Sequence, residues 1–364
     1  MRRRTLTMAA AAAALLVSGG QLPFAEAGGA ARAAAGRWSA HEAESFWTAE
    51  RMASAVPLPA AAPAPPETSP APAPAAPATP GPSPDPVAAV PPSLAPAPAP
   101  VPASSASVPA RLRPVTAQLP APAGPGVGQN VDGIAVVGRM FVMKGGGAYF
   151  CTASVVSSPG RNLVLSAAHC LLGTDSRQVA FVPRYTRADP QPYGKFPVLR
   201  DARGRSKVWI DPRYRSQGTD RAAALDVAFA QVGPDAQGRP VEQVVGGNRL
   251  VTGAGYAHAR VALIGYPASA ARPRLCVNRT TKFTSTDARI PGSFLRIHCT
   301  GYPGGTSGGP FLTRYDRRTG TGDVIGVIGG WKTGGDTPDT SYSSYFGTAV
   351  RKLYEKAVAA AKAG

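Results

Sequence analysis

The chain has 364 residues, and 39 lysines and arginines against 21 aspartates and glutamates give it a formal net charge of +18. Its basic residues are scattered and no basic stretch is interleaved with aromatic side chains, which argues against specific nucleic-acid binding and favours a surface that attracts polyanions, cell walls or acidic proteins. Much of the first third is Ala and Pro, so about 235 residues from near Val127 remain to form a core.

Residues 1–27 have the pattern of a signal peptide. Arg2-Arg3-Arg4 is a charged start, Met8 to Val17 is an apolar stretch too short to span a bilayer, and Ala25-Glu26-Ala27 fits the cleavage rule. We therefore predict a secreted, extracellular protein without a membrane anchor after processing. A retained anchor is the alternative.

Residues 28–57 contain a small apolar island from about Arg37 to Pro57. Phe46, Trp47 and Glu50 are near neighbours on a helix, which predicts one short amphipathic helix that is too short to be stable alone. One interpretation is a pro-segment that docks on the catalytic domain, and the other is a leftover apolar stretch. Residues 58–126 are rich in Ala and Pro and predict a disordered, extended spacer.

Residues 127–364 carry short β-rich runs separated by turn residues, which predicts an all-β barrel or sandwich. The runs form two sets of six, about 130–233 and about 234–350, on either side of Gly233-Pro234-Asp235, and Val241–Gly246 is the first run of the second set. A terminal helix is expected over about 348–362, because its apolar residues have helical spacing.

The four cysteines form two pairs that are local in sequence, Cys151 with Cys170 and Cys276 with Cys299. In an exported chain an even number of cysteines indicates disulfides, each stabilising by roughly 3 kcal/mol in the chain-entropy model. A zinc site is a weak alternative, since no C-x-x-C pair is present, and we predict neither a metal nor another cofactor.

Ser307 lies in the glycine-rich stretch Gly304-Gly305-Thr306-Ser307-Gly308-Gly309-Pro310. A hydroxyl among glycines could be a nucleophile with backbone N–H groups aimed at an oxyanion, or part of a plain surface loop. His169 is the best candidate base, because an apolar strand and small residues place it at a strand end beside Cys170.

A base of this kind needs a carboxylate, and Asp226 opens the apolar run Asp226–Val232. A carboxylate at the mouth of a buried strand is costly unless a partner such as an imidazole N–H satisfies it. Competing acids such as Asp220, Asp211 and Asp201 lie in Arg-rich stretches, where surface ion pairing is the natural interpretation.

The order His169, Asp226, Ser307 resembles that of chymotrypsin-fold (trypsin-like) serine endopeptidases. The stretches that carry the resemblance are Ser166–Cys170, the Asp226 strand, Phe150–Val156 and Pro303–Pro310, and they look closest to secreted bacterial members, including the glutamyl endopeptidase-like branch. The resemblance covers about Val136 to Val358. It implies two six-stranded antiparallel β-barrels with the active site between them and a C-terminal helix.

The resemblance also implies residue roles. Ser307 would attack the scissile carbonyl, His169 would act as base and acid, Asp226 would orient it, and the N–H groups of Gly305 and Ser307 would form the oxyanion hole. The pocket for the residue before the cut would be walled by Gly301, Tyr302, Gly329, Gly330 and Trp331. The implied partner is a protein or peptide substrate of a monomeric enzyme.

At three positions this sequence departs from the better-known serine endopeptidases of the family that it resembles. Thr306 stands where animal enzymes carry the aspartate that pairs with a newly cut N-terminus, so activation by that switch is not predicted. Gly301 replaces the aspartate of Lys/Arg-specific enzymes, and Ile328 replaces a histidine of glutamyl-specific ones, which leaves a hydrophobic or small residue before the cut as the default. The alternative function is a catalytically silent binding protein acting on cell-wall polymers or acidic proteins. A lipase-like hydrolase is disfavoured, because its serine elbow lies on a strand–helix turn with histidine last in the chain order, whereas here histidine comes first.

Overall fold

The computed structural model describes residues 38–59, 124–173 and 175–362, all of which belong to one compact unit. The predicted signal peptide lies outside the described residues, and so does nearly all of the predicted spacer. In the described part of the chain, no helix is long and apolar enough to cross a membrane.

The first sheet contains the strands that carry the candidate base and carboxylate. Its order is β8-β7-β4-β5-β6-β10-β9, with β1 added on β5. The bounds are β1 Val56–Pro57, β4 Val137–Lys144, β5 Gly147–Val156, β6 Leu163–Ser166, β7 Asp175–Pro183, β8 Phe196–Pro197, β9 Val208–Ile210 and β10 Ala228–Gln231.

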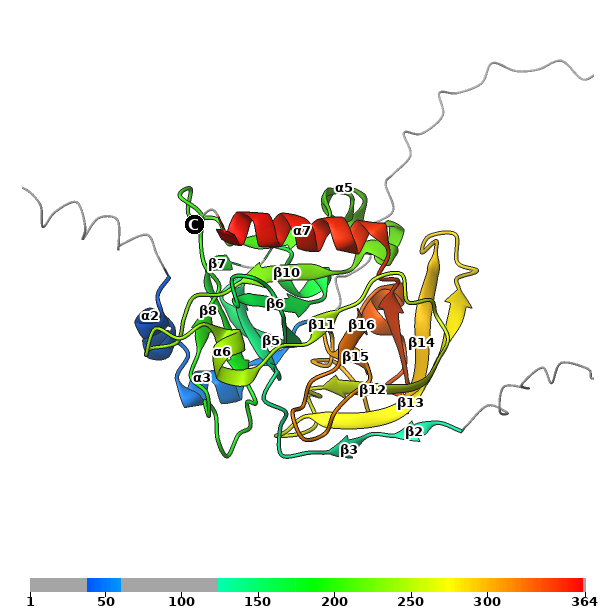
Figure 1. The fold of residues 1–364 in the computed structure, drawn as a ribbon, viewed down its shortest axis with the longest axis horizontal. Coiled ribbons are helices and arrows are strands. Elements are labelled where there is room, and N and C mark those ends of the chain that lie inside the picture. Colours follow the sequence, from blue (N-terminus) through cyan, green and yellow to red (C-terminus); the bar gives the residue numbers. More distant parts are fainter. Residues whose placement is uncertain (1–37, 60–123, 174, 363–364) are drawn as a thin grey trace, which may run out of the picture. The chain divides into compact units, whose positions relative to one another are not determined.

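The second sheet carries the candidate nucleophile, and its order is β11-β16-β15-β12-β13-β14-β17. Two short strands from the start of the domain join it, β2 on β14 and β3 on β13, below β13 in Figure 1. The bounds are β2 Gly126–Val127, β3 Gln129–Asn130, β11 Arg249–Leu250, β12 His258–Gly265, β13 Arg274–Thr284, β14 Ser293–Thr300, β15 Pro310–Thr313, β16 Asp323–Val327 and β17 Thr340–Ser344.

These two sheets confirm the all-β, double-barrel fold class. They hold eight and nine strands in the described residues, more than the six expected for each, because short edge strands such as β1, β2 and β3 extend them. Each sheet encloses apolar side chains, and each contains one of the two predicted disulfides, Cys151–Cys170 and Cys276–Cys299.

The terminal helix α7 (Thr348–Lys362) has the predicted bounds. It follows the second barrel, yet it packs back across the first sheet, above β10 in Figure 1. Val350, Leu353 and Ala357 are buried, and the Tyr354 ring packs edge-on against Phe229 while its hydroxyl donates to the Ser157 carbonyl. The helix thereby holds the two barrels together.

The prediction of one strand was wrong. Residues 241–245 form helix α6 (Val241–Val245) instead of the first strand of the second barrel. Two residues favour the start of a helix, Pro240 at the N-cap and Glu242 in the first turn, and Gly246 at positive φ favours its end. These signals outweigh the strand preference of the three valines. The other short helices are α4 Ala168–Leu171, α5 Pro212–Arg221, η1 Ala223–Leu225 and η2 Trp331–Gly334.

The apolar island forms two helices where the sequence predicted one, α2 (Ala40–Phe46) and α3 (Ala49–Ser54). Thr48 separates them, because its side chain accepts from the Arg51 N–H and so begins a new helix. Trp47 and Met52 are fully buried and join the same apolar cluster as Phe141 and Phe150 of the first barrel. Residues 38–59 are therefore packed onto the first barrel.

Candidate active site

The pairing of β6 with β10 brings His169 and Asp226 together. Ala228 lies opposite Ser166 in an antiparallel register, so the chain leaving β6 and the chain entering β10 meet at one end of the sheet. His169 follows on the single turn α4, and Asp226 ends the turn η1. Both side chains are buried.

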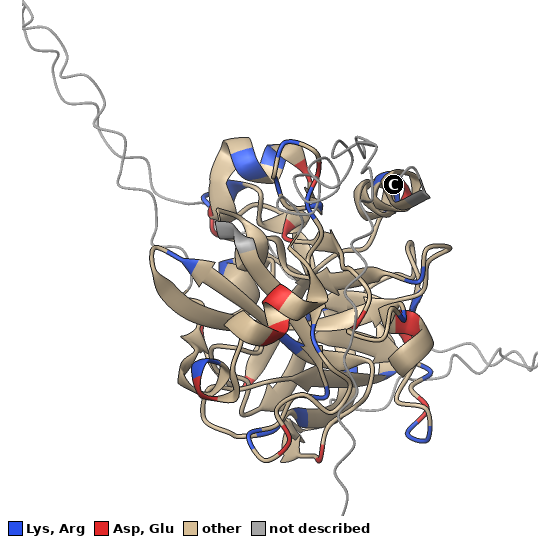
Figure 2. Cartoon of the chain, turned by 90° about the vertical axis from the view of Figure 1, so that its left-hand side faces the viewer, with Lys and Arg blue, Asp and Glu red and all other residues tan. Residues whose placement is uncertain are grey.

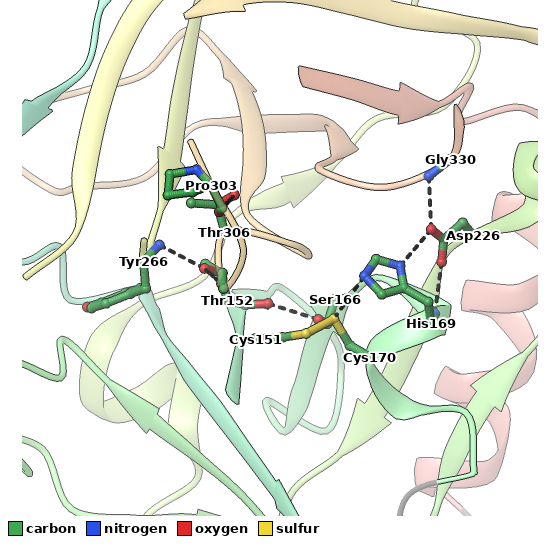
Figure 3. Close-up of a disulfide and its surroundings, with 11 residues drawn as sticks. Cys151, Thr152, Ser166, His169, Cys170, Asp226, Tyr266, Pro303, Thr306 and Gly330 are labelled. Carbon is green, nitrogen blue, oxygen red and sulfur yellow. Dashed lines mark hydrogen bonds and ion pairs between the residues drawn. A yellow bond between two sulfur atoms is a disulfide. The ribbon is translucent and has the colours of Figure 1, made fainter. Parts of the chain in front are cut away.

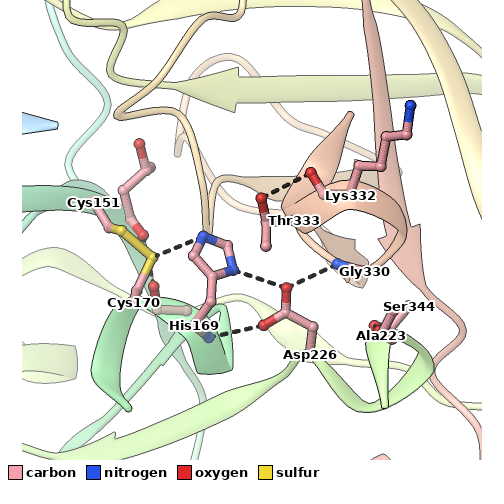
Figure 4. A network of polar contacts seen from close by, with 11 residues as sticks. Cys151, His169, Cys170, Ala223, Asp226, Gly330, Lys332, Thr333 and Ser344 are labelled. Carbon is pink, nitrogen blue, oxygen red and sulfur yellow. Dashed lines mark hydrogen bonds and ion pairs between the residues drawn. A yellow bond between two sulfur atoms is a disulfide. The ribbon is translucent and has the colours of Figure 1, made fainter. Parts of the chain in front are cut away.

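The Asp226 carboxylate accepts hydrogen bonds from three N–H groups (Figure 4). Oδ1 accepts from the His169 backbone N–H at 2.9 Å, and Oδ2 lies 2.8 Å from His169 Nδ1 and 2.9 Å from the Gly330 nitrogen. Burial by itself raises the pKa of Asp226, but the charge of His169 and these hydrogen bonds outweigh burial and hold the pKa below its ordinary value. The carboxylate is therefore ionised and fixes the imidazole with Nδ1 as donor, leaving Nε2 as the basic nitrogen.

Thr152 connects the Ser307 loop to the histidine side of the site. The Ser307 carbonyl accepts from the Thr152 N–H at 2.8 Å, and Thr152 Oγ1 donates to the Gly305 carbonyl and accepts from the Tyr266 N–H. Thr152 follows Cys151, whose disulfide leads to Cys170 beside His169 (Figure 3). The structure thus places Ser307, half-buried, in the same region as the His169–Asp226 pair, although no hydrogen bond joins Ser307 to His169 among the described residues.

In the described part of the chain, the loop N–H groups of Gly304, Gly305 and Ser307 have no acceptor, and those of Gly305 and Ser307 are the two that the resemblance assigns to an oxyanion hole. The carbonyl before each one is held: Gly304 accepts from Ala268, and Thr306 accepts from Gly309, both at 2.9 Å. In a trans peptide the N–H points away from the preceding carbonyl, so each anchored carbonyl fixes the direction of the N–H that follows it. The pair is a preformed candidate for binding an oxyanion.

Gly305 has a conformation that only glycine accommodates here. Its φ is +95°, and a Cβ would come within 2.5 Å of Phe150 Cε2 and 2.7 Å of the Tyr266 carbonyl. The neighbouring Thr306 is buried, and its hydroxyl donates to the Pro303 carbonyl at 2.8 Å. A hydrogen bond inside the loop therefore occupies the side chain that stands before Ser307.

The predicted pocket residues fall into two groups. Gly329 and Gly330 lie beside Asp226, and a Cβ at Gly329 would approach Asp226 Oδ2 to 2.9 Å. Trp331 begins η2, and its ring packs against Phe283 and Tyr342. Gly301 and Tyr302 follow β14, where the Tyr302 side chain is buried and its hydroxyl donates to the Leu263 carbonyl. The Tyr302 ring therefore belongs to the second core rather than to an open wall.

Sequence reasoning named Gly330 as a pocket wall but missed its backbone N–H donation to the Asp226 carboxylate, and it missed Thr152, which ties the Ser307 loop to β5. A signal for Gly330 was present, because two consecutive glycines indicate a close approach of the backbone to another group. The role of Thr152 had no such signal, since its contacts are with residues far away in sequence.

The Cys151, His169 and Cys170 ligand atoms lie within 4.8 Å of one another, which is compact enough for a metal ion. Both sulfurs are bonded in the disulfide, with an S–S distance of 2.01 Å. They offer no thiolate ligands, so this cluster does not fit a metal.

Comparisons with known proteins agree with the fold. Residues 151–327 match the sequence profile described as "Trypsin-like peptidase domain". Among solved structures, the protease Anisep from Arthrobacter nicotinovorans aligns with a TM-score of 0.53 and 24% identity over 64% of this chain and 99% of that one, and shows the same fold.

Two further solved structures align with lower scores. A thermostable serine protease AL20 from an extremophilic microorganism has a TM-score of 0.49 and 23% identity over 62% of this chain and 97% of its own. A Glu endopeptidase in complex with MPD has a TM-score of 0.45 and 15% identity over 65% and 99%. A search of the curated proteins found no match.

Proposed function

We propose that this chain, a trypsin-like serine endopeptidase, hydrolyses proteins outside the cell through an acyl-enzyme formed on Ser307. The observation that carries the proposal is the buried His169–Asp226 pair next to a loop with two N–H groups free of internal acceptors. The two disulfides fit an oxidising, extracellular compartment. A monomer acting on protein or peptide substrates without a cofactor is the simplest form of this proposal.

In the first step Ser307 Oγ attacks the scissile carbonyl while His169 Nε2 takes its proton. The carbonyl oxygen becomes negative and accepts hydrogen bonds from the Gly305 and Ser307 N–H groups. Asp226 stays ionised and stabilises the imidazolium. His169 then donates the proton to the departing amine, which leaves the acyl group on Ser307.

In the second step water replaces the amine. His169 Nε2 accepts a proton from the water, whose oxygen attacks the acyl carbon, and the same two N–H groups hold the oxyanion again. Collapse of this intermediate returns the proton to Ser307 and releases the carboxylic acid. The Asp226 hydrogen bond to the His169 backbone N–H keeps the ring in place throughout.

Labelling with a serine-directed fluorophosphonate tests the proposal. We expect the reagent to modify Ser307 in the folded, disulfide-intact protein and to abolish hydrolysis of peptide anilides, and Ser307→Ala to remove both labelling and hydrolysis. His258→Ala is a matched control, because His258 lies on β12 and its side chain hydrogen-bonds the Gly255 carbonyl of the neighbouring turn. A folded protein that is neither labelled nor active would favour the silent binding protein instead.

A further inference from the structure

Residues 38–59 end in a strand that pairs with the edge of β5. Val56 lies opposite Tyr149 and Pro57 opposite Phe150 in a parallel register, and the Leu58 N–H donates to the Phe150 carbonyl at 3.1 Å. On this side β6 pairs only with the far part of β5, from Ser154 onward. The edge at Tyr149–Phe150 would therefore be open without this segment.

The same edge leads directly into the candidate active site. Phe150 is followed by Cys151, bonded to the cysteine beside His169, and by Thr152, whose N–H binds the Ser307 carbonyl. Pro57 also reaches the nucleophile loop, because a Cβ at Gly304 would lie 3.3 Å from Pro57 Cβ. The strand β1 thus lies against the rim of the loop that carries Ser307.

The position of β1 concerns the part of a substrate that follows the scissile bond. Figure 4 shows His169 between the Cys151–Cys170 disulfide and the Asp226–Gly330 contact. The predicted pocket for the residue before the cut is on the Gly330 side. An extended peptide that crosses Ser307 from that pocket would continue toward the disulfide and β5, where it would meet the edge that β1 occupies.

We infer that residues 38–59 are a built-in restraint, which fills the β5 edge that residues after the scissile bond need. This inference rests on the proposed function. The restraint is directed at one part of the site only, because the Gly305 and Ser307 N–H groups have no internal acceptor and the His169–Asp226 pair is already formed. The proposed catalytic groups are therefore already arranged, and only the β5 edge that would bind residues after the scissile bond is covered.

The segment is held by more than its strand. The indole N–H groups of Trp38 and Trp47 donate to the Val179 and Gln178 carbonyls of β7, and the buried Lys195 ammonium donates to the Glu44 carbonyl. Because residues 60–123 join it covalently to the rest of the chain, it rebinds as an intramolecular partner. Cleavage within residues 60–123 would remove this tether and let a bound segment dissociate.

A substrate series on the full chain tests the inference. Anilides that end at the scissile bond are compared with peptides that share the same residues before the bond and extend stepwise after it. We expect kcat/KM of the full chain to fall or stay flat relative to the anilide as residues are added, since β1 blocks their edge. A steady gain in kcat/KM with added residues would overturn the inference without any variant being needed.

Variants of β1 give the second measurement. Leu58→Pro removes the N–H donor to Phe150 and Pro57→Gly removes the ring against Gly304, so the double variant should raise the peptide-to-anilide ratio of kcat/KM roughly tenfold. Ser39→Ala is the matched control, because it breaks only the capping box of α2. An unchanged ratio in a folded double variant would count against the restraint, whereas absent labelling of Ser307 and absent anilide hydrolysis would count against the proposed function itself.

Discussion

Replacing Asp226 best separates the orientation of the His169 imidazole from the stability of the folded protein. Asp226→Asn keeps the side-chain shape, but an amide NH₂ cannot accept from both His169 N–H groups, so the imidazole loses its fixed tautomer. We expect kcat to fall about 10⁴-fold, as in related triads. Labelling and cleavage assays measure this, and thermal unfolding in parallel shows whether the fold persists. A variant with near-normal kcat would assign the carboxylate role to another acid.

The pKa of Asp226 also sets an acid limit to stability. Because its folded-state pKa lies below the ordinary value of about 3.9, the stabilisation is fully present above about pH 4 and is lost as the pH falls through the lowered pKa. The difference in free energy of unfolding between the wild type and Asp226→Asn should therefore shrink below about pH 4. Denaturant titrations across this range measure it, and a difference that grows toward acid pH would contradict the assignment.

A substitution at Gly305 tests whether the backbone conformation of the Ser307 loop is needed for activity. Gly305→Ala adds a Cβ 2.5 Å from Phe150 Cε2 at a φ of +95°, so the loop must shift and move the Gly305 N–H that we propose as an oxyanion donor. We expect kcat to fall by about 10²–10³. Gly238→Ala is the matched control, because Gly238 also has positive φ, +78°, but a Cβ there meets nothing within 4 Å. Equal losses of activity in both variants would mean that backbone strain, not displacement of the N–H, is responsible.

At the scale of elements, α7 connects the two barrels. Its buried Leu353 belongs to an apolar cluster to which both sheets contribute, and the helix as a whole packs against β9 and β10. Leu353→Ala should cost about 2–5 kcal/mol of unfolding free energy, while Lys352→Ala, exposed on the same turn, should change it by less than about 0.5 kcal/mol. Chemical denaturation measures both, and similar small effects would show that the helix is dispensable to barrel association.

At the scale of the molecule, much of the architecture could be predicted from the sequence. The alternation of apolar runs, the local cysteine pairs and the order His169, Asp226, Ser307 all reflect local patterns, and the fold and disulfides agree with them. Val241–Val245 became a helix because capping residues decided what valine preference left open. Local patterns left docking of the segment that contains residues 38–59 open as one interpretation and indicated a close approach of the backbone at Gly330 to another group. The partners of both lie more than a hundred residues away, so no local pattern identifies them.

Charge is the property of the whole chain that bears on substrate choice. The formal net charge is +18, and Figure 2 shows lysines and arginines spread over several elements of one face with aspartates and glutamates between them. Several arginines pair with nearby carboxylates, such as Arg213 with Asp211 and Arg289 with Asp287, so the excess acts as a diffuse field rather than a single binding patch.

A diffuse field accelerates the encounter with acidic proteins, and salt screens it within about 8–10 Å at physiological ionic strength. We expect kcat/KM on an acidic protein substrate to fall several-fold as salt rises from about 0.01 M to about 0.3 M, while kcat/KM on a neutral anilide stays constant. The anilide controls for effects of salt on the catalytic groups. If both substrates respond alike, salt acts on the site itself, and the basic surface has no part in substrate capture.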